Sequence, residues 1–160
     1  MRKQLLAFIT AAALLAGCGS KEQNTVPEKA AADIQVSASS IADSLLEQFT
    51  GKMEPEDREL LVKLMNLDPE TVVDAIGYYD PEAPEKMMII VESADENAAL
   101  DNTEKMEYYL NTVKDAASMY SPEQVQILED AYITTRGSYS VLITSEDQNA
   151  AKKAVASQLN

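Results

Sequence analysis

Residues 72–91, Val-Val-Asp-Ala-Ile-Gly-Tyr-Tyr-Asp-Pro-Glu-Ala-Pro-Glu-Lys-Met-Met-Ile-Ile-Val, decide the fold because they combine two strand patterns with a turn. Residues 72–79 follow the two-residue period of a β-strand. Two prolines within residues 80–85 predict a turn. The continuous apolar run 87–91 predicts a second strand at the centre of a sheet. The stretch is therefore predicted to form a β-hairpin.

The chain after this hairpin repeats the same order of elements. We predict, in sequence, a long helix over residues 93–119, a short helix from Ser121, strands over 131–135 and 139–143, and a last helix over 146–158. The segments 93–99 and 145–151 are also similar in sequence, at an offset of 52 residues. Short Ser- and Ala-rich matches also arise by coincidence, but the flanking periodicity favours two similar hairpin–helix halves.

Three of the predicted helices start with a Ser that is followed three residues later by Glu or Gln. In such a capping box the Ser side chain accepts a hydrogen bond from the first turn, and the Glu or Gln side chain accepts one from the Ser amide. The pairs are Ser93 with Glu96, Ser121 with Gln124, and Ser145 with Gln148. The sequence therefore predicts these serines as N-caps.

Two further helices are predicted before the hairpin. Apolar residues at helical spacing indicate the first over residues 39–49, and Pro55 suits the first turn of the second. The predicted fold class is α+β. We expect a four-stranded, mostly antiparallel sheet from two β-hairpins, each followed by a helix, with two N-terminal helices and the helices on one face.

The N-terminus has the features of an export signal. The apolar run 5–15 is too short to span a membrane as a helix. It ends in Leu15-Ala16-Gly17-Cys18, which resembles the lipobox of bacterial lipoprotein precursors. The resemblance implies a diacylglyceryl group on Cys18 and cleavage just before it. The alternative is an ordinary thiol in an ordinary signal peptide.

These features predict three segments. We expect a lipoprotein signal peptide over residues 1–17, a polar, flexible tether over residues 18–37, and one α+β domain over residues 38–160. Acyl chains on Cys18 would anchor the domain to the outer, extracytoplasmic face of the cell membrane without spanning it.

The composition is strongly acidic, with 27 Asp and Glu against 13 Lys and Arg and a net charge of −14. Removal of Arg2 and Lys3 with the signal peptide leaves 11 basic residues and a net charge of −16. A nucleic-acid partner is disfavoured, because phosphate binding needs clustered basic residues. Solubility is the simpler explanation of the charge, and capture of cations or basic peptides is the functional alternative.

The sequence lacks the residues that most catalytic sites use. It contains no histidine, which excludes Ser-His-Asp and Cys-His catalysis and histidine-based metal sites. Cys18 is the only cysteine, so acylation would leave no free thiol, and no glycine-rich phosphate loop is present. We therefore expect a non-enzymatic protein with no catalytic residue, no metal ligand and no cofactor.

Carboxylates remain as candidate site residues. Asp80, Glu82 and Glu85 gather in the predicted turn of the first hairpin. A solvated acidic turn is the first interpretation, and weak binding of a divalent cation is the alternative. A carboxylate pair could also support hydrolysis of cell-wall glycan.

Tyrosines are the other candidates. Strand geometry places Tyr78 and Tyr79 on opposite faces of the first strand. Tyr132 and Tyr139 flank the second predicted turn and could pair across it. Packing at the sheet edge is the first interpretation. The functional alternative is a patch on an open sheet face that binds a peptide or glycan.

From about Ser39 onward the chain resembles the DUF4358 family, small lipoproteins of Gram-positive bacteria. The matching features, in order, are Leu67-Asp68-Pro69-Glu70, a strand ending in Tyr78-Tyr79, the apolar strand 87–91, the helix start 95–99, Tyr120-Ser121-Pro122-Glu123, and residues 136–143. The resemblance implies the fold, the export route and the lipid anchor. It implies no activity, because the family has none assigned. We expect a binding or interaction module at the cell surface, which holds a small ligand, a peptide or a partner protein against the membrane.

Overall fold

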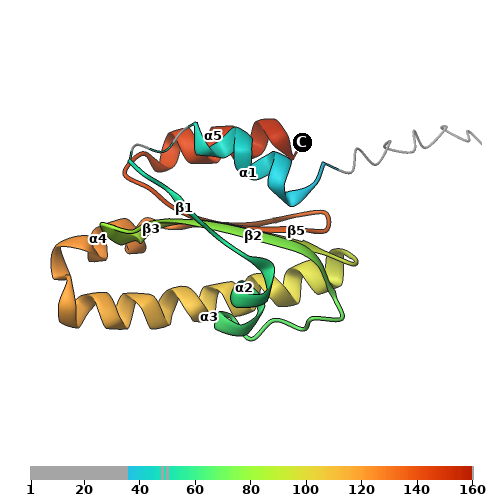
Figure 1. Ribbon diagram of the computed structural model, residues 1–160, viewed down its shortest axis with the longest axis horizontal. Helices are drawn as coiled ribbons and strands as arrows, with labels where there is room; N and C mark the ends of the chain where they lie inside the picture. The colour runs from blue at the N-terminus through green and yellow to red at the C-terminus, as the bar shows by residue number, and fades with distance from the viewer. Residues whose placement is uncertain (1–35, 48, 50, 160) are drawn as a thin grey trace, which may run out of the picture. The chain divides into compact units, whose positions relative to one another are not determined.

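A five-stranded antiparallel sheet lies at the centre of the domain, in the order β1-β2-β3-β5-β4 (Figure 1). Its strands are β1 (Glu54–Glu56), β2 (Val72–Asp80), β3 (Ala83–Ser93), β4 (Tyr132–Arg136) and β5 (Tyr139–Thr144). This computed structural model describes residues 36–159 other than 48 and 50. Cys18, the signal peptide and residues 18–35 of the tether lie outside the described residues. The α+β class and the central position of β3 are confirmed.

The prediction of four strands is wrong, because a short strand precedes the first hairpin. Pro55 lies in β1 and pairs with Tyr78 of β2, instead of starting a helix. An edge strand tolerates proline because one side of its backbone has no ladder partner. The second helix starts only at Arg58, where the Asp57 side chain accepts a hydrogen bond from the Leu60 amide.

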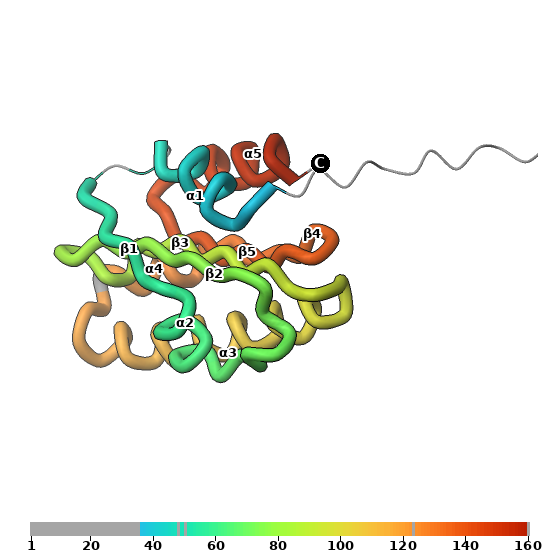
Figure 2. The backbone as a smooth tube through the Cα atoms, turned by 45° about the vertical axis from the view of Figure 1, so that its right-hand side comes forward, coloured from blue at the N-terminus to red at the C-terminus, as the bar shows by residue number. Residues whose placement is uncertain are grey.

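Helices cover both faces of the sheet (Figures 1 and 2). The helices are α1 (Ala38–Leu46), α2 (Arg58–Leu64), α3 (Glu96–Tyr120), α4 (Val125–Glu129) and α5 (Gln148–Gln158), with a 3-10 turn η1 (Pro122–Gln124) before α4. Helices α2, α3 and α4 pack on one face, and α1 and α5 pack on the other. The prediction that all helices lie on one face is therefore wrong.

The two covered faces follow from the apolar residues of β3. Met87, Ile89 and Val91 belong to the core under α2, α3 and α4, whereas Met88 and Ile90 belong to the core under α1 and α5. Successive side chains of a strand point to opposite faces, so a continuously apolar strand needs a layer on each side. The two N-terminal helices consequently lie on opposite faces, with β1 carrying the chain past the sheet edge between them (Figure 1).

The long helix α3 packs along one apolar stripe. Ala99, Met106, Leu110 and Ala117 are buried, at the four- and seven-residue spacings of one helix face. The opposite face is mostly polar. No helix among the described residues is long and apolar enough to cross a membrane.

The predicted capping boxes are wrong, because aspartates cap α3 and α5. Asp95 accepts a hydrogen bond from the Ala98 amide, and Asp147 accepts one from the Ala150 amide, both at 2.9 Å. Ser93 still belongs to β3, where its amide donates to the Ser138 carbonyl at 2.8 Å. Ser121 does occupy the N-cap position of η1, but its side chain makes no cap hydrogen bond.

The offset of 52 residues is nevertheless visible in the structure. Asp95 and Asp147 are 52 residues apart, and each follows a hairpin. The two helices that they cap pack on opposite faces of the sheet, so the halves share the order of elements without sharing their packing.

The turn of the first hairpin is shorter than predicted. Asp80 pairs with Ala83, which leaves Pro81 and Glu82 as the turn. Pro84 and Glu85 belong to β3, at a register shift next to the Tyr79–Met87 pair. Such irregularities bend a strand and re-aim its side chains.

Candidate functional site

A cavity of about 200 Å³ lies between α2 and the β2–β3 hairpin. Its wall is mostly apolar and aromatic. The lining residues are Glu56, Leu61, Leu64, Gly77, Tyr78, Tyr79, Pro84, Met87, Ile89 and Tyr109. They come from β1, α2, both strands of the hairpin and the middle of α3.

A second cavity of about 300 Å³ adjoins the first along α3. Its lining consists of Pro84, Glu85, Met87, Tyr109, Val113, Ala116, Ala117, Tyr120 and Ser121. Pro84, Met87 and Tyr109 line both cavities. We call the two cavities together the tyrosine groove, because Tyr78, Tyr79, Tyr109 and Tyr120 line it.

Two local features of the sequence shape the groove. Gly77 lets α2 approach the sheet, because a Cβ at this position would lie only 3.0 Å from Cδ2 of Leu61. The irregular end of β3 places Pro84 and Glu85 beside the C-terminal half of α3. Concave, mostly apolar surfaces with a few polar groups are typical of ligand sites.

Negative charge dominates the groove. Glu56 and Glu85 line it, and none of the described lining residues is Lys or Arg. Burial raises the pKa of the Tyr109 hydroxyl above its ordinary value, and the nearby Glu56 carboxylate raises the pKa further. Lys52, just before β1, is bound to Glu54 at 2.8 Å.

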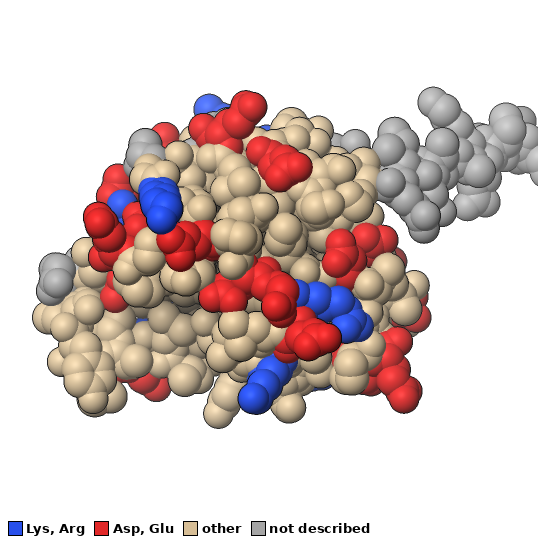
Figure 3. Space-filling view, in the orientation of Figure 1, with Lys and Arg blue, Asp and Glu red and all other residues tan. Residues whose placement is uncertain are grey.

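Exposed apolar side chains stand at the rim of the groove. They are Leu60 and Leu64 of α2 and Met119 and Tyr120 of α3. The exposed fraction of Tyr120 is 84%. In Figure 3 few of the described residues over the C-terminal end of α3, at the lower left, are charged. Acidic side chains are more frequent over the rest of this view. Apolar side chains gathered at the rim of a cavity are typical of interaction sites.

The structure separates the acidic residues of the first hairpin. Asp80 is buried, and its side chain accepts a hydrogen bond from the Glu82 amide at 2.9 Å. Glu85 lines the second cavity, whereas Glu82 lies in the turn. Among the described residues, no group of three or more acidic residues could hold a metal ion.

The predicted tyrosine positions are confirmed in part. Tyr78 packs with the core under α1 and α5, and Tyr79 packs with the core under α3, so they do point to opposite faces. Tyr132 pairs with Ile143 and Tyr139 pairs with Arg136, so the two tyrosines are not direct cross-strand partners. The open sheet face expected for a binding patch does not exist, because α1 and α5 cover it.

Tyr109 and Tyr120 line the groove, although no sequence pattern predicted them as site residues. Tyr109 lies three residues after Met106 of the buried stripe, which places it at the edge of the apolar face. Nothing in the sequence indicated that α2 and the hairpin would lie beside it.

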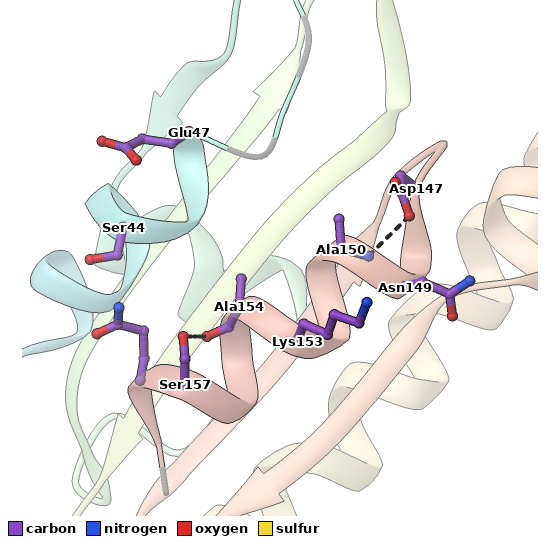
Figure 4. Close-up of a pocket in the computed structure, with 9 residues that line it drawn as sticks. Ser44, Glu47, Asp147, Asn149, Ala150, Lys153, Ala154 and Ser157 are labelled. Atoms are coloured by element: carbon purple, nitrogen blue, oxygen red, sulfur yellow. Dashed lines mark hydrogen bonds between the residues drawn. The ribbon is translucent and has the colours of Figure 1, made fainter.

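A larger depression of about 610 Å³ lies between α1 and α5 (Figure 4). Its lining is polar, with Ser44 and Glu47 from the α1 side and Asn149, Lys153 and Ser157 from α5. Local contacts already engage several of its polar groups. Asp147 caps α5, and the Ser157 hydroxyl donates to the Ala154 carbonyl at 2.7 Å. The depression is an open seam between two helices, and we assign it no ligand.

The fold and the groove together define an α+β domain with an antiparallel sheet and a lateral apolar cavity. The chain belongs to the DUF4358 family, whose model, described as a domain of unknown function, matches residues 47–145. The match contains the whole sheet and the tyrosine groove, whereas α1 and α5 lie outside it. No curated protein and no solved structure matches the chain significantly.

Proposed function

We propose that this protein is a non-enzymatic binding module, anchored by lipid on Cys18 to the extracytoplasmic face of the cell membrane, and that the tyrosine groove is its binding site. The observation that carries the proposal is the pair of adjoining cavities between α2, the hairpin and α3. Their apolar walls and the rings of Tyr79, Tyr109 and Tyr120 favour an organic ligand or an apolar side chain of a partner.

The groove can be tested with protein-observed NMR on the domain. Mixtures of small organic molecules, each with an apolar body and one polar group, should shift the amide signals of Met87 and Tyr109. Tyr109→Ala should abolish the shifts. Lys153→Ala, in the polar depression, is the matched control and should leave them intact. Shifts confined to the α1–α5 seam, or none with any mixture, would contradict the proposal.

The proposed lipid anchor is inferred from residues 15–18, and it can be tested separately from the groove. Wild-type protein should remain in the membrane fraction through a high-salt wash and enter the detergent phase, because two acyl chains suffice for stable anchoring. Cys18→Ala should appear in the aqueous phase. Equal partition of the two proteins would show that the membrane association does not depend on Cys18.

A further inference from the structure

We propose that the tyrosine groove selects a small organic cation, a molecule with an alkylammonium head on an apolar stem. This inference rests on the proposal that the groove is a binding site, and it names the chemical class of the ligand. It concerns a free small molecule, not a side chain of a partner protein.

The arrangement of aromatic rings and carboxylates is the first argument. Tyr109 lines both cavities, with Glu56 in the first and Glu85 in the second. An ammonium group is attracted to the face of an aromatic ring, and a nearby carboxylate adds to the attraction. Tyr79 and Tyr120 contribute rings to the first and the second cavity.

The distribution of charge is the second argument. An anionic ligand would find no Lys or Arg among the described lining residues, and it would approach two carboxylates. The raised pKa of Tyr109 has the same origin in part, because the Glu56 carboxylate disfavours a second negative charge beside it. Lys52, two residues before β1, does not line the groove, and its ammonium group is bound to the Glu54 carboxylate.

The walls of the groove favour an organic cation over a metal ion. Leu61, Met87 and Ile89 offer no oxygen or nitrogen ligand, and a metal ion would lose its hydration shell against them. An alkyl stem gains free energy from the same contacts. The volumes of about 200 and 300 Å³ fit a small molecule that extends from one cavity into the next.

The test uses three probes that share one alkyl stem and differ in charge: hexylammonium, hexanol and hexanoate. Their dissociation constants for the wild-type domain are measured by NMR titration at neutral pH. We expect hexylammonium to bind about tenfold more tightly than hexanol, and hexanoate to bind least. Equal affinity of hexanol and hexylammonium would overturn the cation inference while the binding site itself stands.

Two pairs of variants test whether Glu56 and Tyr109 cause the preference for hexylammonium over hexanol. Glu56→Gln should reduce the preference for hexylammonium over hexanol severalfold, whereas Glu104→Gln, an exposed residue of α3 outside the groove, should not. Tyr109→Phe keeps the aromatic face and should keep the preference, whereas Tyr109→Leu should lose it. A preference unchanged by Glu56→Gln and by Tyr109→Leu would place the cation elsewhere and overturn the inference.

A fourth probe separates the source of the cation. A short peptide with one lysine between apolar residues carries the same ammonium group on a macromolecular ligand. If the peptide shifts the groove signals and hexylammonium does not, the ligand is a peptide and the small-molecule inference is wrong. If none of the four probes shifts them, the proposed site itself fails.

Discussion

Tyr109 joins the core of the protein to its candidate site. The residue packs against the buried cluster under α2 and α3, and it also lines both cavities of the tyrosine groove. Partial burial of its hydroxyl raises the pKa of Tyr109, and the Glu56 carboxylate adds to this effect. The ionisation of Tyr109 therefore reports both the fold and the charge of the groove.

We expect the Tyr109 phenol to make the stability depend on pH in the alkaline range. Its pKa in the folded state lies above the ordinary value of 10.0, so the unfolded chain loses this proton first. The free energy of unfolding should therefore fall as pH rises from about 9 to about 11. Urea unfolding across this range should show a smaller fall for Tyr109→Phe. Tyr108→Phe, whose ring is exposed, is the control.

If the free energy of unfolding depends on pH in the same way for wild type and Tyr109→Phe, the Tyr109 phenol is not the cause of the fall. A difference absorption titration of the same two proteins gives an independent measure. The signal lost in Tyr109→Phe should titrate above pH 10.0, the ordinary pKa of a tyrosine.

At the level of single elements, the start of each long helix is set by the end of the strand before it. Ser93 and Asp95 both satisfy the sequence rule for an N-cap. The Ser93 amide is bound to the Ser138 carbonyl and its hydroxyl accepts from the Asn102 side chain, so Ser93 still belongs to β3. The helix begins where the sheet hydrogen bonds stop, and Asp95 is then in position to cap it.

Removal of either aspartate cap should lower stability. We expect Asp95→Ala and Asp147→Ala each to lower the free energy of unfolding by about 1 kcal/mol, because a first-turn amide loses its acceptor. Chemical denaturation measures the change. Asp101→Ala removes the same charge from an exposed position inside α3 and should have little effect. A cost for Asp101→Ala as large as that for Asp95→Ala would show that charge, and not capping, is responsible.

At the level of the whole molecule, α1 and α5 complete the second core. They come from opposite ends of the domain and pack on Met88, Ile90, Val141 and Ile143 of the sheet. Both helices lie outside residues 47–145, the range that matches the family model. The matched range alone would expose an apolar sheet face, which is unfavourable in water.

We therefore expect residues 47–145 to lose stable folding when they are produced without the two flanking helices. Residues 36–160 should give a dispersed NMR spectrum and little binding of a hydrophobic dye, whereas residues 47–145 should bind the dye or aggregate. Within the longer chain, Ile41→Asp should have a similar effect, because Ile41 is fully buried. Asp43→Ala, exposed on the same helix, should not. A well-folded, monomeric 47–145 segment would contradict this expectation.

The sequence by itself determined the elements that depend on local patterns. The first hairpin follows from the period of residues 72–79 and the prolines after it, and the long helix follows from the spacing of Ala99, Met106 and Leu110. The apolar run 87–91 also contained the evidence for two covered faces, because both sides of β3 are apolar.

Only the tertiary structure decided how these elements meet. The three residues of β1 are too short to show a period, and they form a strand because β2 offers an edge. The tyrosine groove needs β1, α2, the hairpin and α3 together, so residues as distant as Glu56 and Tyr120 line one surface. Local patterns fix which face of an element is apolar, but contacts between distant segments fix what that face covers and where a cavity remains.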